Sequence, residues 1–179
     1  MDMMHTRAVG GIVLALVLGL VADPVWADDL LTALHIARVS PGSAAAPFDL
    51  KTLDGRSVQL ADLQGKLVLV NFWATWCGPC KEEMPAFERL RQKLDPGRFA
   101  LLTITTDLQR DGIKHFLTNL NVQLPVLFDE DQDISQAYLV RALPTTVLID
   151  RQGMLVGRAV GPRDWDAPRT VRVLQGMMQ

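Results

Sequence analysis

Two cysteines stand in the segment Trp76-Cys77-Gly78-Pro79-Cys80, and the chain has no others. A run of strand-forming residues, 67–73, comes before them, and a helical pattern, 81–94, comes after. The pair is therefore predicted at a turn from a strand into the N-terminus of a helix. Unpaired N–H groups and a partial positive charge at a helix N-terminus stabilise a thiolate. The types and spacing of these residues predict thiol redox chemistry.

The two cysteines are expected to have different roles. We expect the pKa of the Cys77 thiol to lie below that of a free cysteine, because Cys77 stands at the mouth of the helix. Cys77 is therefore the predicted nucleophile. Cys80 lies one turn further into the helix, where it can attack the mixed disulfide that Cys77 forms and release the partner in reduced form.

Two other uses of a cysteine pair fit this sequence less well. A structural disulfide here would close a loop of four residues and stabilise the fold by roughly 2 kcal/mol, against about 4.7 kcal/mol for a hundred-residue loop. A zinc site would need two more ligands, and His5, His35 and His115 are scattered singly without the spacing of a zinc-binding pair. No metal site and no cofactor are predicted.

Composition narrows the class of protein and of partner. The 179 residues are 49% hydrophobic and carry a formal charge of -2, which indicates a compact globular domain. No basic block is present, and phosphate binding depends on clustered Lys and Arg, so nucleic acid is not an expected partner. The expected partner is a protein or a small thiol, and the chain is expected to be a monomer.

Residues 1–27 have the pattern of an export signal. His5 and Arg7 precede an apolar run at 8–22, and Val25-Trp26-Ala27 supplies small residues at the cleavage positions. A run of about 15 residues is shorter than the roughly 18 to 20 of a spanning helix, so cleavage is favoured over an uncleaved anchor facing the periplasm. The predicted location is the periplasm. Disulfides persist there, so a reduced pair would need a dedicated membrane thiol:disulfide electron donor.

The remaining chain alternates strand and helix patterns. Residues 28–46 are predicted to be a leader helix and a small-residue linker, and 47–179 a single domain. That domain begins with a hairpin around Asp54-Gly55. After the cysteine helix we expect a strand at 98–106, a helix at 111–120, a strand at 126–128, a helix at 134–140, a hairpin over 145–160 and a helix at 165–178. The prediction is an α/β fold, a central mixed sheet with helices on both faces.

Several segments carry a family resemblance. Residues 68–80 resemble the thioredoxin active-site segment, and residues 46–50, 53–55, 83–85 and 143–150 are similar to the TlpA/ResA type of exported thioredoxin. The resemblance implies a thioredoxin fold with an N-terminal β-hairpin extension and an inserted strand-helix unit at about 113–128. It also implies a cis proline at Pro144, packed against the cysteine pair. The backbone around Leu143 would then bind a client chain in strand-like fashion. Apart from the resemblance, we expect Trp76 to cap the site and contact clients, and Trp73 to support the core.

One position departs from cytosolic thioredoxin. Where thioredoxins carry a buried aspartate that exchanges protons with the second cysteine, this chain has Asn71, which cannot titrate. Glu83 lies three residues after Cys80 on the same helix face. In the TlpA/ResA type the matching glutamate lies in a cavity beside the active site. We therefore predict that Glu83, its pKa raised by partial burial, handles the proton of Cys80.

The predicted function is reduction of disulfides in exported client proteins. Gly78-Pro79 is the thioredoxin dipeptide, and thioredoxin lies near -270 mV whereas the oxidant DsbA lies near -120 mV. The resemblance implies apo-cytochrome c or copper-site proteins as clients. A thiol peroxidase is an alternative, although Thr75 precedes Cys77 by two residues and not by the three of the peroxiredoxin pattern. A Cu(I) chaperone that uses both thiolates is a second alternative.

Overall fold

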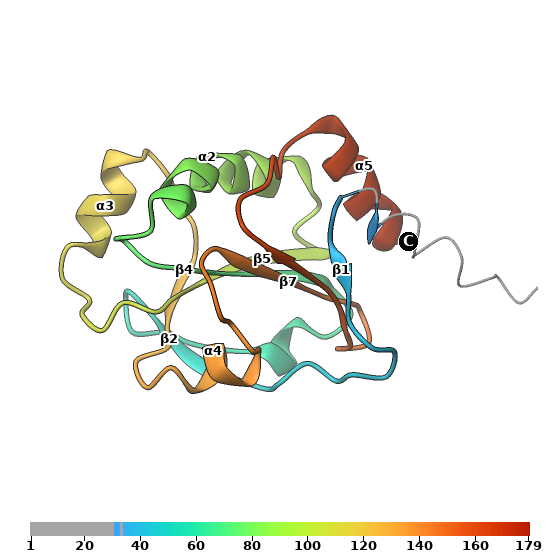
Figure 1. Cartoon of the computed structure of the whole chain (residues 1–179), viewed down its shortest axis with the longest axis horizontal. Helices are drawn as coiled ribbons and strands as arrows, with labels where there is room; N and C mark the ends of the chain where they lie inside the picture. Colours follow the sequence, from blue (N-terminus) through green and yellow to red (C-terminus); the bar gives the residue numbers. More distant parts are fainter. Residues whose placement is uncertain (1–30, 33) are drawn as a thin grey trace, which may run out of the picture.

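Eight strands form one mixed sheet in the computed structural model, which describes residues 31, 32 and 34–179 (Figure 1). The predicted signal peptide, residues 1–27, lies outside these described residues. The strand order across the sheet is β1-β8-β7-β4-β5-β6-β2-β3. The strands are β1 (Ala37–Arg38), β2 (Asp49–Thr52), β3 (Ser57–Gln59), β4 (Leu67–Trp73), β5 (Phe99–Thr105), β6 (Val126–Phe128), β7 (Thr145–Ile149) and β8 (Leu155–Val160).

Helices cover both faces of this sheet, as the sequence predicted. They are α2 (Gly78–Lys93), α3 (Ile113–Asn119), α4 (Asp133–Ala137) and α5 (Pro168–Met177), with a 3-10 turn, η1 (Leu60–Leu63). Figure 1 shows α2, α3 and α5 on one face and α4 on the other. Among the described residues, no helix combines the length and the apolar character needed to cross a membrane.

Strand β4 is central, and all seven of its residues are buried. It runs parallel to β5 and antiparallel to β7. Because successive side chains of a strand point to opposite faces, Val68, Val70 and Phe72 join the core on the α4 side. Leu69 and Trp73 join the core under α2. A strand buried on both faces explains why this segment reads as a continuous apolar run.

The predicted elements are present, with small differences at their ends. The strands predicted at 67–73 and 126–128 have those bounds, as β4 and β6. Helix α2 begins at Gly78, three residues earlier than its apolar periodicity indicated, because Pro79 suits the first turn of a helix. The inserted unit consists of α3 and β6, and β6 joins β5 to the N-terminal hairpin through β2. The observed architecture confirms the predicted fold class.

The segment before residue 47 differs from the prediction of a leader helix on a tether. Ala37–Arg38 forms β1 and pairs with β8 at the sheet edge. Leu31 and Ile36 are buried, and a Cβ atom built on Gly157 of β8 would lie only 2.6 Å from Cγ2 of Ile36. The predicted helix is therefore wrong for Ala37 and Arg38, although residues 31 and 32 are helical, and the leader is packed on the sheet. The physical reason is that Gly157 leaves a depression in the sheet that the apolar leader side chains fill.

Candidate active site

The two cysteines are joined in a disulfide at the turn from β4 into α2. Their sulfur atoms are 2.00 Å apart, and their Cα atoms are 5.3 Å apart. Cys77 is the N-cap residue of α2, and its Sγ accepts a hydrogen bond from the backbone N–H of Cys80 at 3.2 Å. Cys77 is 5% exposed and Cys80 is fully buried. Of the two sulfur-bearing residues, Cys77 is thus the nearer to the surface and sits at the end of the helix dipole.

This arrangement favours a negative charge on Cys77 once the disulfide is reduced. The 16-residue helix α2 directs its free N–H groups toward Sγ, and Arg91 and Lys93 lie in its last turn, far from the sulfur. A thiolate at the N-terminus of such a helix gains both a hydrogen bond and a favourable dipole interaction. Cys80 is buried one turn deeper and lacks this position. The two thiols are therefore chemically unequal.

Glu83 lies on the buried face of α2 and is 3% exposed. Its Oε1 accepts a hydrogen bond from Nδ2 of Asn71 at 2.9 Å. Its Oε2 accepts one from the indole N–H of Trp165 at 3.0 Å and one from the backbone N–H of Arg163 at 3.3 Å. A cavity of about 310 Å³ between α2 and the segment 162–164 is lined in part by Glu83. The carboxyl group is buried beside a cavity through which water can exchange protons.

Burial raises the pKa of Glu83 to about 7, and the hydrogen bonds from Trp165, Asn71 and Arg163 oppose this rise. Desolvation dominates because a carboxylate loses more solvation energy on burial than three donors return. A carboxyl group with a pKa near neutrality can gain or lose a proton at physiological pH. Glu83 therefore has the properties of a general acid or base.

Asn71 connects this carboxyl group to the sheet. The side chain of Asn71 faces α2, because its neighbours Val70 and Phe72 in β4 face α4. Its Nδ2 also donates a hydrogen bond to Oγ1 of Thr146 in the adjacent strand β7, at 3.0 Å. Its Oδ1 is buried and has no hydrogen-bond partner in the described structure. A protonated Glu83 would need an acceptor, and rotation of the Asn71 amide would supply that oxygen. The amide can thus serve either protonation state of Glu83.

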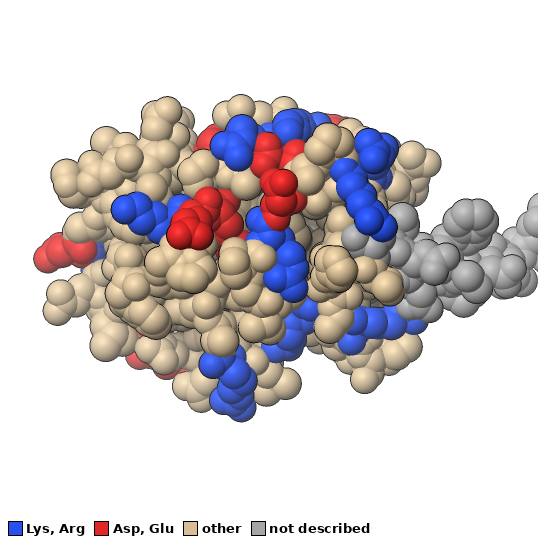
Figure 2. All heavy atoms as spheres, turned by 45° about the horizontal axis from the view of Figure 1, so that its top comes forward, with Lys and Arg blue, Asp and Glu red and all other residues tan. Residues whose placement is uncertain are grey.

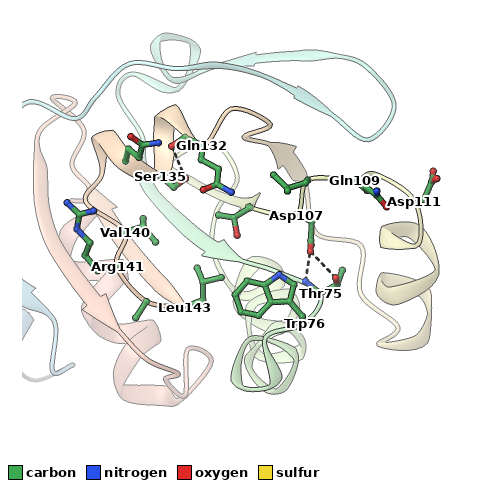
Figure 3. Close-up of a pocket in the computed structure, with 14 residues that line it drawn as sticks. Thr75, Trp76, Asp107, Gln109, Asp111, Gln132, Ser135, Val140, Arg141 and Leu143 are labelled. Atoms are coloured by element: carbon green, nitrogen blue, oxygen red, sulfur yellow. Dashed lines mark hydrogen bonds between the residues drawn. The ribbon is translucent and has the colours of Figure 1, made fainter.

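A groove is lined by Thr75 and Trp76, the two residues directly before Cys77, and we call it the Trp76 groove (Figure 3). Its volume is about 750 Å³, and its walls come from the β4–α2 turn, the loop after β5 and the segment from α4 to β7. Trp76 is 73% exposed, whereas Trp73 is fully buried, as predicted. Leu143 lines the groove, and the Leu143–Pro144 peptide bond is cis, as the resemblance implied.

Asp107 fixes the turn that carries the disulfide. Its Oδ2 accepts a hydrogen bond from the backbone N–H of Thr75 at 2.9 Å, and its Oδ1 accepts one from the Thr75 hydroxyl at 2.9 Å (Figure 3). The hydroxyl of Thr105, the last residue of β5, donates to Oδ2 at 2.8 Å. The loop after β5 is therefore tied to the residues directly before Cys77.

Charges of both signs occur on the surface. On the face drawn in Figure 2, acidic side chains lie beside basic ones, and basic side chains gather toward the half that carries α5 and β1. Within residues 31, 32 and 34–179, no group of three or more Cys, His, Asp or Glu side chains is arranged to hold a metal ion. The chemistry that this site displays comes from sulfur and from a carboxyl group.

The structure brings together the predicted residues in two groups. Cys80 and Glu83 lie on α2, Cys77 is its N-cap residue, and Gly78 and Pro79 lie in its first turn. Trp76 and Leu143 line the Trp76 groove, with Pro144 next to it in the chain. Sequence reasoning missed two contributors, Trp165 and Asp107. Asp107 could have been predicted, because the carboxyl ends of the parallel strands β4 and β5 meet at one edge of the sheet. Trp165 could not, because it is 82 residues from Glu83 and no pattern near it in the sequence indicates the contact.

Known proteins resemble this chain both in sequence and in structure. Residues 41–158 match the AhpC/TSA family. The chain is 33% identical over 138 residues to the thiol-disulfide oxidoreductase ResA of Bacillus cereus, a match that covers 77% of this chain and 76% of the relative. It is 34% identical over 123 residues to ResA of Bacillus subtilis, covering 69% of each. Its structure is similar to that of a protein from Chlorobium tepidum described as a putative thiol:disulfide interchange protein DsbE. That match has a TM-score of 0.71 and 28% identity, and covers 79% of this chain and 99% of the other.

Proposed function

The chain belongs to the AhpC/TSA family and is a thiol-disulfide oxidoreductase of the ResA type, and from this premise we propose that it reduces disulfides of exported client proteins through Cys77 and Cys80. The observation that carries the proposal is the placement of Cys77 Sγ at the N-cap of α2, within hydrogen-bond distance of the Cys80 N–H. A sulfur in this position is activated as a nucleophile and also as a leaving group.

The reaction proceeds by two exchanges between sulfur atoms. The Cys77 thiolate attacks one sulfur of the client disulfide, forms a mixed disulfide and releases the other client sulfur as a thiolate, which takes up a proton. Cys80 then loses its proton and attacks Sγ of Cys77, which releases the second client thiol. The client disulfide gains two electrons, and the protein is left with the Cys77–Cys80 disulfide that the structure contains.

Glu83 is proposed to accept the proton of Cys80 in the second exchange. Cys80 and Glu83 are one turn apart on the buried face of α2, and the pKa of Glu83, raised by burial to about 7, suits proton transfer at neutral pH. The cavity beside Glu83 supports this role, because it offers a path for the proton to reach water. Regeneration of the dithiol reverses these steps and needs an external electron donor.

The Trp76 groove is proposed to hold the client. Trp76 offers an exposed aromatic surface, and Leu143, which precedes the cis Pro144, lines the same groove. An extended client segment can add strand-like backbone contacts at such an edge. The exposed indole would cover the reacting sulfur atoms during exchange and exclude water.

Export to the periplasm and the direction of electron flow belong to the same proposal. The pattern of residues 1–27 supports export by a signal peptide, and the Gly78-Pro79 dipeptide supports a reducing potential. A membrane thiol:disulfide donor would then return the protein to the dithiol form. Clients in cytochrome c maturation or copper-site assembly are consistent with the family resemblance.

Trapping of the mixed disulfide tests this function. A Cys80→Ala variant of the full-length protein, expressed in cells, should accumulate covalent adducts through Cys77 that a reductant dissolves, and a variant lacking both cysteines should form none. The absence of adducts from a correctly exported Cys80→Ala variant would contradict client reduction. The purified parent protein should not consume peroxide, because Thr75 lacks the spacing to Cys77 that the peroxiredoxin pattern requires. Peroxide consumption with a thiol donor, or tight Cu(I) binding without disulfide reduction, would favour the peroxidase or the copper chaperone instead.

A further inference from the structure

The Trp76 groove carries opposite charges at its two ends. One end lies in the loop after β5, where Asp111 follows Asp107 along the wall of the groove. The other end lies between α4 and β7, where Arg141 forms part of the wall. Figure 3 shows Asp111 and Arg141 on opposite sides of Trp76. The groove is therefore negative at one end and positive at the other, and Trp76, the residue directly before Cys77, lies between the two ends.

The two terminal charges are available to a ligand. Asp111 and Arg141 are both exposed, and neither takes part in any of the ion pairs or hydrogen bonds of the described residues. Asp107 is different, because its two carboxylate oxygens accept three hydrogen bonds from Thr75 and Thr105. Asp107 therefore holds the wall in place, while Asp111 supplies the negative charge that an incoming chain would meet.

Two large apolar side chains that line the groove are exposed. Trp76 is 73% exposed and Leu108 is 75% exposed, although large apolar side chains usually gain free energy by burial. Leu143 lies between Trp76 and Arg141 in Figure 3. An occupant that places an apolar surface against Trp76 and Leu108 and charged groups at both ends would match the whole lining.

We propose that the Trp76 groove selects extended client segments whose reactive cysteine is flanked by a basic residue on one side and an acidic residue on the other. The basic side chain would lie at Asp111 and the acidic one at Arg141, so the polarity of the groove sets the direction in which the client chain runs. This inference rests on the proposed client reduction and adds the sequence preference and orientation of the client. Charge complementarity of this kind governs register and encounter rate more than affinity.

Two synthetic peptides test the preference in the reduced, mature protein. Each has one central cysteine, carried as a mixed disulfide with 5-thio-2-nitrobenzoate, and an apolar residue beside it. One peptide has lysines before the cysteine and glutamates after it, and the other has the reverse order. Cys77 attacks the peptide sulfur and releases the coloured thiolate; Cys80 then displaces the peptide thiol, and the protein disulfide forms. The release of colour in this single turnover gives the second-order rate constant for each peptide.

The decisive comparison is with a protein in which the groove charges are exchanged, Asp111→Lys with Arg141→Glu. Its net charge is unchanged, and both positions are exposed, so folding should be preserved. The parent protein should prefer one peptide by about fivefold at low salt, since exposed charge pairs contribute little individually. The exchanged variant should prefer the other peptide by a similar factor. A control variant, Lys51→Glu with Asp62→Lys, changes the same charges outside the groove and should retain the parent preference.

The outcomes separate this inference from the function on which it rests. If no peptide releases colour, client reduction itself fails. If both peptides react at the same rate, or if the preference survives exchange of the groove charges, the groove does not select by charge and the inference is overturned. Should the exchanged variant fold poorly, Asp111→Asn and Arg141→Gln separately should each reduce the preference of the parent. Addition of 0.5 M salt should also reduce it, because exposed charges are screened.

Discussion

The indole N–H of Trp165 donates a hydrogen bond to Oε2 of Glu83 at 3.0 Å, although 82 residues separate them in the chain. Trp165 is 1% exposed and stacks on Phe87 of α2, with ring centroids 5.2 Å apart. The contact therefore joins the loop before α5 to the buried face of the helix that carries the cysteines. It stabilises the charged form of Glu83 and opposes the effect of burial on its pKa.

Replacing Trp165 by Phe should raise the pKa of Glu83 further. The ring can still pack on Phe87, but the carboxylate loses a donor that favours its charged form. The pH profile of the resolving step, measured by stopped-flow disulfide exchange, should move to higher pH. Phe87→Leu serves as the control, because it disturbs the same packing and keeps the indole N–H. A profile that shifts equally in both variants would assign the effect to packing.

Removing the carboxyl group should slow resolution of the mixed disulfide. In Glu83→Gln the side chain keeps its shape but cannot take the proton of Cys80, so the second exchange should be about a hundredfold slower near pH 7. Single-turnover kinetics with a disulfide peptide separate this step from the first attack by Cys77. The exposed neighbour Glu82 offers a matched control, and Glu82→Gln should behave as the parent. An unchanged rate and pH profile in Glu83→Gln would remove Glu83 from the mechanism.

The same carboxyl group should make folding stability depend on pH. The native protein holds the Glu83 proton up to about pH 7, whereas the unfolded chain releases it near 4.5. Between these values the native state binds more protons, so the free energy of unfolding falls as pH rises, by about 3 kcal/mol in total. Urea unfolding of Glu83→Gln at pH 5 and pH 8 should show a smaller loss than the parent. An equal loss in both proteins would contradict the raised pKa.

Loss of the Asp107 carboxylate should loosen the turn before Cys77. Asp107→Ala removes three hydrogen bonds to Thr75 and Thr105 and should lower the free energy of unfolding by about 2 kcal/mol. Alkylation of Cys77 in the reduced protein should become slower, although removal of a nearby negative charge alone would favour the thiolate. Thr75→Val removes one of the three bonds and should have a smaller effect in the same direction. Faster alkylation would show that loss of the negative charge of Asp107 affects Cys77 more than loosening of the turn does.

A methyl group on Gly157 should displace the leader segment. The added Cβ of Gly157→Ala would meet Cγ2 of Ile36 at 2.6 Å, and such overpacking costs about 1–3 kcal/mol. The leader residues should also become more sensitive to protease. Ile36→Ala removes the clashing atom, so the double variant should be less destabilised than the sum of the two single ones. Simple additivity in this double-mutant cycle would indicate that the leader does not pack on β8.

Local patterns in the sequence determined the order of the elements and the identity of the reactive pair. The apolar run 67–73 and the cysteine motif after it interact mainly with near neighbours, so strand, turn and N-cap were predictable from adjacent residues. The hairpin around Asp54-Gly55 and the short strand β6 were predictable for the same reason. The predicted ends of helices differed from the observed ends by a few residues, because caps depend on single side chains.

Tertiary structure decided the surroundings of that pair. The environment of Glu83 depends on Trp165 and Arg163, which reach its carboxyl group from a loop about 80 residues away. It depends also on the face of β4 from which Asn71 points. The leader was mispredicted because its partner, Gly157, lies in a distant strand. Burial and long-range hydrogen bonds arise only when distant segments meet. The type of chemistry was therefore encoded locally, whereas the pKa of Glu83 and the lining of the Trp76 groove were set by the folded chain.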